Sequence, residues 1–455
     1  MIVELIVLLA SIFVFLQFVK GRGGESNSPT LEEAEQKLAK KELEKEKLVK
    51  KSTSAQKPTG KSLKKLNQAS KKLDHKEFEH GLLTNTLKGH TKCVNDISFS
   101  ENGKFIATSD GERSILLWPT KELGKGNTSY RYNTAHDPAL SVKFAPDGKS
   151  LCAILQKENT VALFQVAKQD GGSYELKHIS NAVDFLPGAA LKRAKIAVQF
   201  QSGVQAGSFL YHEYSNHTVV LSDLRGNQEL HRFPAASGSN GKTLLSPCSK
   251  FVVGFGDSAE IRGWAVLFKS GSYASTKKLH SLCGHKSNVS QAAFFPDSSK
   301  LISLSDASGF KIYDFNSADW QRDDTPREAE AFPNQWGAVD SILISPDNLI
   351  LALVQHSSIK FISLRTKVLV LEIKDIFNGA IKSVEFSPDS ELVAVAGDRC
   401  VRIFKNLPGL IARAHEAKSK LMNPNCNETY RNRLLAELKS DQKQINELQK
   451  QLLSS

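Results

Sequence analysis

The sequence predicts an all-β domain over residues 81–405, with a membrane-spanning helix and a charged linker before it and a helix after it. Two observations carry this prediction. A short apolar unit that ends in a tight turn, usually with a Pro, recurs along the middle of the chain, and a landmark residue follows six of the seven turns at a nearly constant distance. We therefore divide the chain into residues 1–20, 21–80, 81–405 and 406–455.

Composition narrows the class of protein. The chain has 455 residues and a formal net charge of +12, and the excess of Lys and Arg lies mostly outside residues 81–405. This composition excludes collagen, a disulfide scaffold and a multispanning membrane protein. The six cysteines are scattered without a C-x-x-C pair, which is typical of reduced thiols facing the cytosol. Any attraction to RNA or acidic lipid is expected from the flanking segments.

Residues 2–19 form an apolar run with three polar interruptions, of which only Glu4 is charged. A helix of that length is about 27 Å long, close to the thickness of a thin bilayer. A cleaved signal peptide is the alternative, but the basic residues Lys20 and Arg22 follow the run instead of preceding it. Under the positive-inside rule, an uncleaved anchor leaves the rest of the chain in the cytosol.

The linker over residues 21–80 has almost no aromatic residues and cannot bury a core. Residues 50–76 of this linker are rich in lysine and contain a single acid, Asp74. These lysines make a candidate lipid- or RNA-binding patch, although no aromatic residues alternate with them for base stacking. A solvated spacer is the alternative. The candidate patch consists of Lys50, Lys51, Lys61, Lys64, Lys65, Lys71 and Lys72.

The middle of the chain is built from repeats of alternating strands. In every repeat but the first, which has Glu101 at this position, a Pro presets the backbone of a tight turn, as in Phe386-Ser-Pro-Asp-Ser390. Copies of this unit begin at Phe99, Phe144, Leu245, Phe294, Ile344 and Phe386, with a weaker one at Phe185. The landmarks are Trp118, Phe164, Ser222, Trp264, Tyr313, Ile362 and Phe404. This periodicity predicts a β-propeller of seven blades, in which residues 82–88 supply the outer strand of the last blade.

Gly89-His90 with Trp118, and Gly284-His285 with Tyr313-Asp314, resemble the GH…WD pattern of the WD40 family. The fold class is thus a seven-bladed WD40 β-propeller. The resemblance implies buried hydrogen-bond networks that join the GH histidine, a Ser or Thr, a turn acid and the Trp. In the first repeat the matching residues are His90, Thr108 and Trp118, with Glu112 near the position of the acid. In the fifth repeat they are His285, Ser303 or Ser305, Asp306 and Tyr313.

The third repeat carries extra residues between Ala189 and Tyr214. They mix cations with aromatic residues, a composition enriched at protein interfaces. The candidate partner surface consists of Lys192, Arg193, Lys195, Phe209 and Tyr211. Longer strands are the alternative interpretation of this segment.

The C-terminal tail carries a heptad seam of apolar residues with one polar member. The seam consists of Leu434, Leu438, Asp441, Ile445, Leu448 and Leu452. Two alternatives stay open: the helix packs back on the propeller, or it pairs with a partner helix.

The sequence contains no catalytic constellation, no metal-ligand set and no cofactor motif, so we expect no enzyme activity, no cofactor and no small-molecule substrate. Segments such as Ala396–Phe404 and Asn406–Gly409 resemble ER-anchored members of the WD-repeat family. This resemblance implies a single-pass ER membrane scaffold whose propeller faces the cytosol. It further implies binding to the ER stress kinase of the unfolded protein response (PKR-like endoplasmic reticulum kinase) and contact with RNA or ribosomes. The alternative is a membrane-tethered exchange factor for a small GTPase.

Overall fold

The computed structural model describes one compact unit that begins at Phe78. It describes residues 78–454 except 125, 127, 135–136, 146, 157–159, 185–208, 214–218, 224–227, 234–240, 257, 270–271, 316–327 and 423–427. The predicted membrane helix and nearly all of the charged linker therefore lie outside the described residues. Within the described part, no helix is long and apolar enough to cross a membrane.

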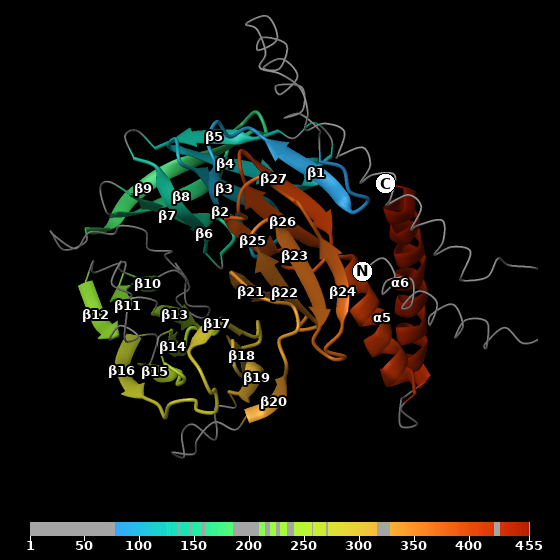
Figure 1. Cartoon of the computed structure of the whole chain (residues 1–455). Coiled ribbons are helices and arrows are strands. Elements are labelled where there is room, and N and C mark those ends of the chain that lie inside the picture. Colours follow the sequence, from blue (N-terminus) through green and yellow to red (C-terminus); the bar gives the residue numbers. More distant parts are fainter. Residues whose placement is uncertain are drawn as a thin grey trace, which may run out of the picture. The chain divides into compact units, whose positions relative to one another are not determined.

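The described residues before the tail form seven antiparallel sheets, numbered here in chain order (Figure 1). Sheet 1 consists of β2 (Val94–Phe99), β3 (Phe105–Asp110), β4 (Ser114–Pro119) and β5 (Tyr130–Asn133), and a short 3-10 helix, η1 (Thr120–Glu122), follows β4. Sheet 2 consists of β6 (Ala139–Phe144), β7 (Ser150–Leu155), β8 (Thr160–Lys168) and β9 (Tyr174–Asp184). Sheet 3 consists of β10 (Phe209–Glu213), β11 (Val219–Asp223) and β12 (Gln228–Phe233).

The remaining sheets have four strands each. Sheet 4 consists of β13 (Lys242–Leu245), β14 (Phe251–Phe255), β15 (Arg262–Lys269) and β16 (Ser272–Lys278). Sheet 5 consists of β17 (Val289–Phe294), β18 (Lys300–Ser305), β19 (Gly309–Asp314) and β20 (Glu328–Phe332). Sheet 6 consists of β21 (Ser341–Ile344), β22 (Ile350–Gln355), β23 (Ser358–Ser363) and β24 (Leu369–Ile373). Sheet 7 consists of β25 (Ser383–Phe386), β26 (Leu392–Gly397), β27 (Cys400–Lys405) and β1 (Leu83–Lys88).

The prediction of seven complete blades needs a correction, because the described residues form six four-stranded blades and the three-stranded sheet 3. The repeat unit at Phe185 requires a strand just before it. Instead, β9 continues its pairing with β8 as far as Asp184, which lies opposite Thr160. The residues that would have begun the third blade are thus the end of the outer strand of sheet 2.

Apolar side chains between successive sheets make the core. Separate clusters join sheets 1 and 2, 3 and 4, 4 and 5, 5 and 6, and 6 and 7. A further cluster places Ala394 and Val401 of sheet 7 against Ile106 and Trp118 of sheet 1. The last sheet therefore packs on the first, which is how a β-propeller closes.

The prediction that residues 82–88 complete the last blade is confirmed. Strand β1 pairs antiparallel with β27, with Leu87 opposite Val401 and Lys88 opposite Cys400 (Figure 1). The first strand of the domain thus covers the edge that the last strand would otherwise expose.

The predicted Pro-containing turns also join neighbouring sheets. In four of them one residue has a left-handed backbone, at Ser249, Ser298, Asn348 and Ser390. The amide of Cys248 donates to the hydroxyl of Ser298 at 2.9 Å, and that of Asp347 donates to the hydroxyl of Ser390 at 3.1 Å. Each of these contacts links the turn of one sheet to the turn of the next, so the motif both reverses the chain and holds the ring together.

The tail forms α5 (Leu407–Leu421) and α6 (Glu428–Ser454), which lie side by side (Figure 1) and are called the tail hairpin below. Helix α5 begins directly after β27. Its cap is Asn406, whose side chain accepts from the amide of Gly409 at 3.0 Å and donates to the carbonyl of Ser390 at 2.9 Å. The cap therefore anchors the helix to the last turn of sheet 7.

Candidate functional site

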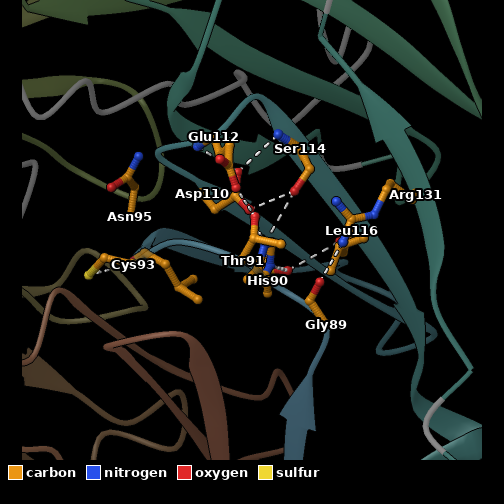
Figure 2. Close-up of polar contacts among 12 residues, drawn as sticks. Gly89, His90, Thr91, Cys93, Asn95, Asp110, Glu112, Ser114, Leu116 and Arg131 are labelled. Atoms are coloured by element: carbon orange, nitrogen blue, oxygen red, sulfur yellow. Dashed lines mark hydrogen bonds and ion pairs between the residues drawn. The ribbon is translucent and has the colours of Figure 1, made fainter.

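The structure brings the three residues predicted in the first repeat into one buried network, and Figure 2 shows the part around His90, Asp110 and Ser114. The indole of Trp118 donates to the Thr108 hydroxyl at 2.9 Å, and that hydroxyl lies 2.7 Å from Nε2 of His90. Nδ1 of His90 lies 2.9 Å from Oδ2 of Asp110. A carboxylate only accepts, so Nδ1 carries the proton and Nε2 of a neutral ring accepts from Thr108. The network thus runs from Trp118 to the carboxylate.

The acid of this network is Asp110, and the prediction that Glu112 stands near this position is wrong. Glu112 is exposed and accepts from the hydroxyl of Thr91. Residues two apart on a strand face the same way, so Thr108 and Asp110 of β3 both point toward His90. That spacing is the sequence signal that would have identified Asp110.

Asp110 is held ionised by its surroundings. Burial works to raise its pKa, but hydrogen bonds from His90 and from the hydroxyl and amide of Ser114 outweigh burial and hold the pKa well below its usual range. The carboxylate accepts from the Ser114 hydroxyl at 2.7 Å and from the Glu112 amide at 3.0 Å. With every neighbour donating to it, this acid fixes the turn between β3 and β4.

Sheet 5 holds a shorter version of the same network. Nε2 of His285 lies 2.6 Å from the Ser303 hydroxyl, and the Tyr313 hydroxyl donates to the carbonyl of Cys283 at 3.1 Å. Ser305 ends β18 as Asp110 ends β3, and it contacts the hydroxyl of Ser287 at 2.6 Å. The prediction for Asp306 is therefore corrected: this acid lies one residue further on, in the turn, and is exposed.

These two networks are part of the structural framework of their sheets. The side chains of His90 and Asp110 are both fully buried, and Ser303 and Tyr313 are buried as well. Groups this enclosed cannot reach a partner without opening the sheet. A ligand or protein must therefore meet the loops that surround them.

A charged pair lies on the innermost strands of sheets 2 and 7. Lys143 of β6 contacts Glu385 of β25 at 3.0 Å and donates to the carbonyl of Ile97 at 3.2 Å, so the contact reaches past sheet 1. Burial alone would lower the pKa of Lys143, but Glu385 and Asp96 raise it above its usual range. Burial raises the pKa of Glu385, against the effect of the lysine. Asp96 also accepts from Ser383 at 2.8 Å and from Ser141, which ties the three sheets together.

The predicted heptad seam of the tail is occupied within the chain. Leu434 and Leu438 pack against Ala414 and Ala417 of α5. Leu448, with Ile445 and Leu452 beside it, joins the core that sheets 6 and 7 share. Of the two alternatives for the tail, packing back on the propeller is the one observed.

The tail hairpin also covers the start of the domain. A Cβ built on Gly81 would lie 2.6 Å from the carbonyl oxygen of Gln451 in α6. Just before Gly81, the ring of Phe78 stacks on the Arg402 guanidinium at 4.3 Å, and Phe377 contacts that guanidinium at 4.7 Å. The chain thus enters β1 beneath the end of α6.

The structure does not assemble the two surfaces predicted from charge and insertion. Lys192, Arg193 and Lys195 lie outside the described residues, as do the linker lysines. Phe209 and Tyr211 belong to β10, where they pair with Asp223 and Leu221 of β11. This end of the insertion is therefore a strand of sheet 3, because its β-prone residues find a partner strand there.

Comparison with known proteins agrees with this architecture. The WD40 family, described as "WD domain, G-beta repeat", matches residues 81–119, 276–314 and 372–405. Transducin beta-like protein 2 of Mus musculus is 28% identical over 404 residues, which cover 86% of this chain and 88% of the relative.

Transducin beta-like protein 2 of Homo sapiens is 29% identical over 376 residues, 82% of each chain. Retinoblastoma-binding-like protein E of Dictyostelium discoideum is 33% identical over 84 residues, 18% of this chain and 15% of the relative. The chain thus carries WD40 repeats within a β-propeller and is similar to transducin beta-like protein 2 over most of its length.

Proposed function

We propose that this chain is a non-enzymatic scaffold that holds a protein partner at the cytosolic face of the ER membrane. One observation carries the proposal: the His, Ser, Thr and Asp side chains that form the polar networks of the repeats are enclosed within the sheets, as with His90 and Asp110. The surface left for function is then the loops at the ends of the sheets, which suit protein recognition. The ER stress kinase is the proposed partner, on the basis of the near full-length similarity to transducin beta-like protein 2.

The proposed anchor is the apolar run over residues 2–19, with the propeller in the cytosol. Protease added to intact microsomes should digest the propeller, and Asn216 and Asn288 should carry no glycan. Moving the charges of Lys20 and Arg22 to positions before Glu4 should invert or scramble insertion. A protected, glycosylated propeller would reverse the topology.

The test of kinase binding must distinguish binding to the propeller from the mere presence of both proteins in the ER membrane. The kinase should co-purify with the full chain, and equally with a chain whose residues 1–20 are replaced by an unrelated ER anchor. Residues 1–80 alone should not retain it. If residues 1–80 retain the kinase as well as the full chain does, the propeller is not the binding element.

RNA or ribosome contact belongs to the same proposal, whereas nucleotide exchange is an alternative to it. The lysines between Lys50 and Lys72 supply the charge for RNA or ribosome contact, and crosslinks from RNA should map to them. The second candidate function, nucleotide exchange on a small GTPase, is favoured by the combination of a predicted anchor with a propeller. Release of bound nucleotide from purified small GTPases should not accelerate when the chain is added; acceleration would favour the exchange factor.

A further inference from the structure

The loops at one end of sheets 7 and 1 come together where the ring closes. The amide of Val94 donates to the carbonyl of Asp398 at 2.9 Å, which joins the start of β2 to the turn between β26 and β27. The amide of Gly111 donates to the carbonyl of Cys93 at 3.2 Å, which adds the turn between β3 and β4. The amide of Lys382, just before β25, donates to the carbonyl of Ala396 at 2.9 Å. Four loops from distant parts of the sequence thus share one surface.

This surface, called the basic rim, is rich in exposed cations. They are Lys88, Lys92, Arg113, Arg131, Lys382 and Arg399. Arg131 reaches over from β5 and donates to the carbonyl of Gly89 (Figure 2). Within the described part of the chain, none of Lys92, Lys382 and Arg399 forms an ion pair. These three cations therefore present positive charge that no ion pair among the described residues neutralises.

Three of the acids in these loops are engaged by hydrogen bonds. Asp110 is enclosed by His90 and Ser114, and Glu112 accepts from Thr91. Asp398 accepts from the amide of Asn378 at 3.2 Å. These hydrogen bonds hold the loops in place.

We infer that the basic rim binds a short acidic peptide segment of a protein partner. Charge complementarity favours an anionic ligand. The absence of an exposed aromatic side chain in these four described loops favours a peptide over RNA. The aromatic residue of these loops, Phe377, is buried against Arg402 and cannot stack on a base. The inference deepens the proposed scaffold function, on which it rests, by assigning the loops that recognise the partner.

The test uses full-length chain in detergent and a fluorescent peptide of ten glutamates, with a ten-glutamine peptide and oligo-uridine RNA as competitors. The variant Lys382→Glu/Arg399→Glu should weaken peptide binding at least about tenfold at physiological salt. The matched control Lys250→Glu/Lys278→Glu makes the same change in net charge at exposed sites away from the rim and should weaken it less than about twofold.

Several results would overturn the inference. These are equal loss in both double variants, no binding of the glutamate peptide, or displacement of that peptide by oligo-uridine at lower concentration than by unlabelled peptide. The single variant Lys92→Glu provides a second measurement if the double variant does not fold, and it should weaken binding several-fold. Because the assay contains no kinase, failure of kinase co-purification would refute the choice of partner and leave the peptide result standing.

Discussion

At the scale of single residues, the polar network of sheet 1 explains which acid matters. Asp110 accepts from His90 and Ser114 in a buried site, whereas Asp306, in the turn just past the equivalent strand of sheet 5, is exposed. We expect Asp110→Asn to lower the free energy of unfolding by about 1–3 kcal/mol, because a charge-assisted buried bond is lost. Asp306→Asn, the same chemical change, should stay within about 0.5 kcal/mol. Urea unfolding of both variants checks this, and equal costs would contradict the assignment.

The same carboxylate predicts a dependence of stability on pH. Hydrogen bonds from His90 and Ser114 overcome the opposing effect of burial and hold the pKa of Asp110 well below its usual range in the folded state. The stabilisation that ionised Asp110 gives the folded state is therefore fully present above the ordinary Asp pKa of about 4, and it is lost as the pH falls below that value. We expect the free energy of unfolding to fall less steeply below about pH 4 in Asp110→Asn than in the unchanged chain. Urea titrations between pH 3 and 7 measure this, and identical slopes would rule out Asp110 as the source.

At the scale of elements, the tail hairpin works as part of the domain, and Gly81 is its most sensitive contact. A Cβ there would lie 2.6 Å from backbone atoms of Gln451 and Leu452, whereas Gly171 has no atom within 4 Å of its added Cβ. Gly81→Ala should therefore cost about 1–3 kcal/mol or displace the end of α6, while Gly171→Ala should be nearly neutral. Thermal unfolding and amide exchange in β1 provide the readout. Unchanged exchange in β1 of Gly81→Ala would mean that α6 does not hold this strand.

At the scale of the whole molecule, the parts of the fold that repeat were the predictable ones. Pro-containing turns and landmarks such as Trp118 set the sheets, and the run before Gly89 located the closing strand. The start of sheet 3 was not predictable from the sequence. The residues before Phe185 alternate equally well as the end of β9 or as a new strand, and their pairing with β8 is what makes them part of β9. Asp110 was missed because a turn acid was expected after the strand. The basic rim depends on four loops meeting in space, which spacing along one chain does not reveal.

Ring closure yields the last prediction. Besides the apolar cluster between sheets 7 and 1, closure involves the outer strand β1 and the inner pair of Lys143 in sheet 2 and Glu385 in sheet 7. The side chains of that pair are 32% and 26% exposed, so solvent screens the attraction in part. Lys143→Met leaves the partly desolvated carboxylate of Glu385 without its cation. The free energy of unfolding should therefore fall by about 1–3 kcal/mol.

Adding Glu385→Gln to Lys143→Met should recover part of that loss, which gives a coupling energy of roughly 1 kcal/mol in the double-mutant cycle. The matched control is Lys300, which lies 3.7 Å from Asp314 of the same sheet, in a pair that is 37% and 49% exposed. Lys300→Met should cost less than about 0.5 kcal/mol, because it breaks a pair within one sheet that is largely hydrated. Amide exchange should locate the difference: Lys143→Met should speed exchange in β1, β2 and β25 together, since losing the inner contact loosens the closure as a unit. Faster exchange confined to β6 would show that the pair stabilises only its own strand.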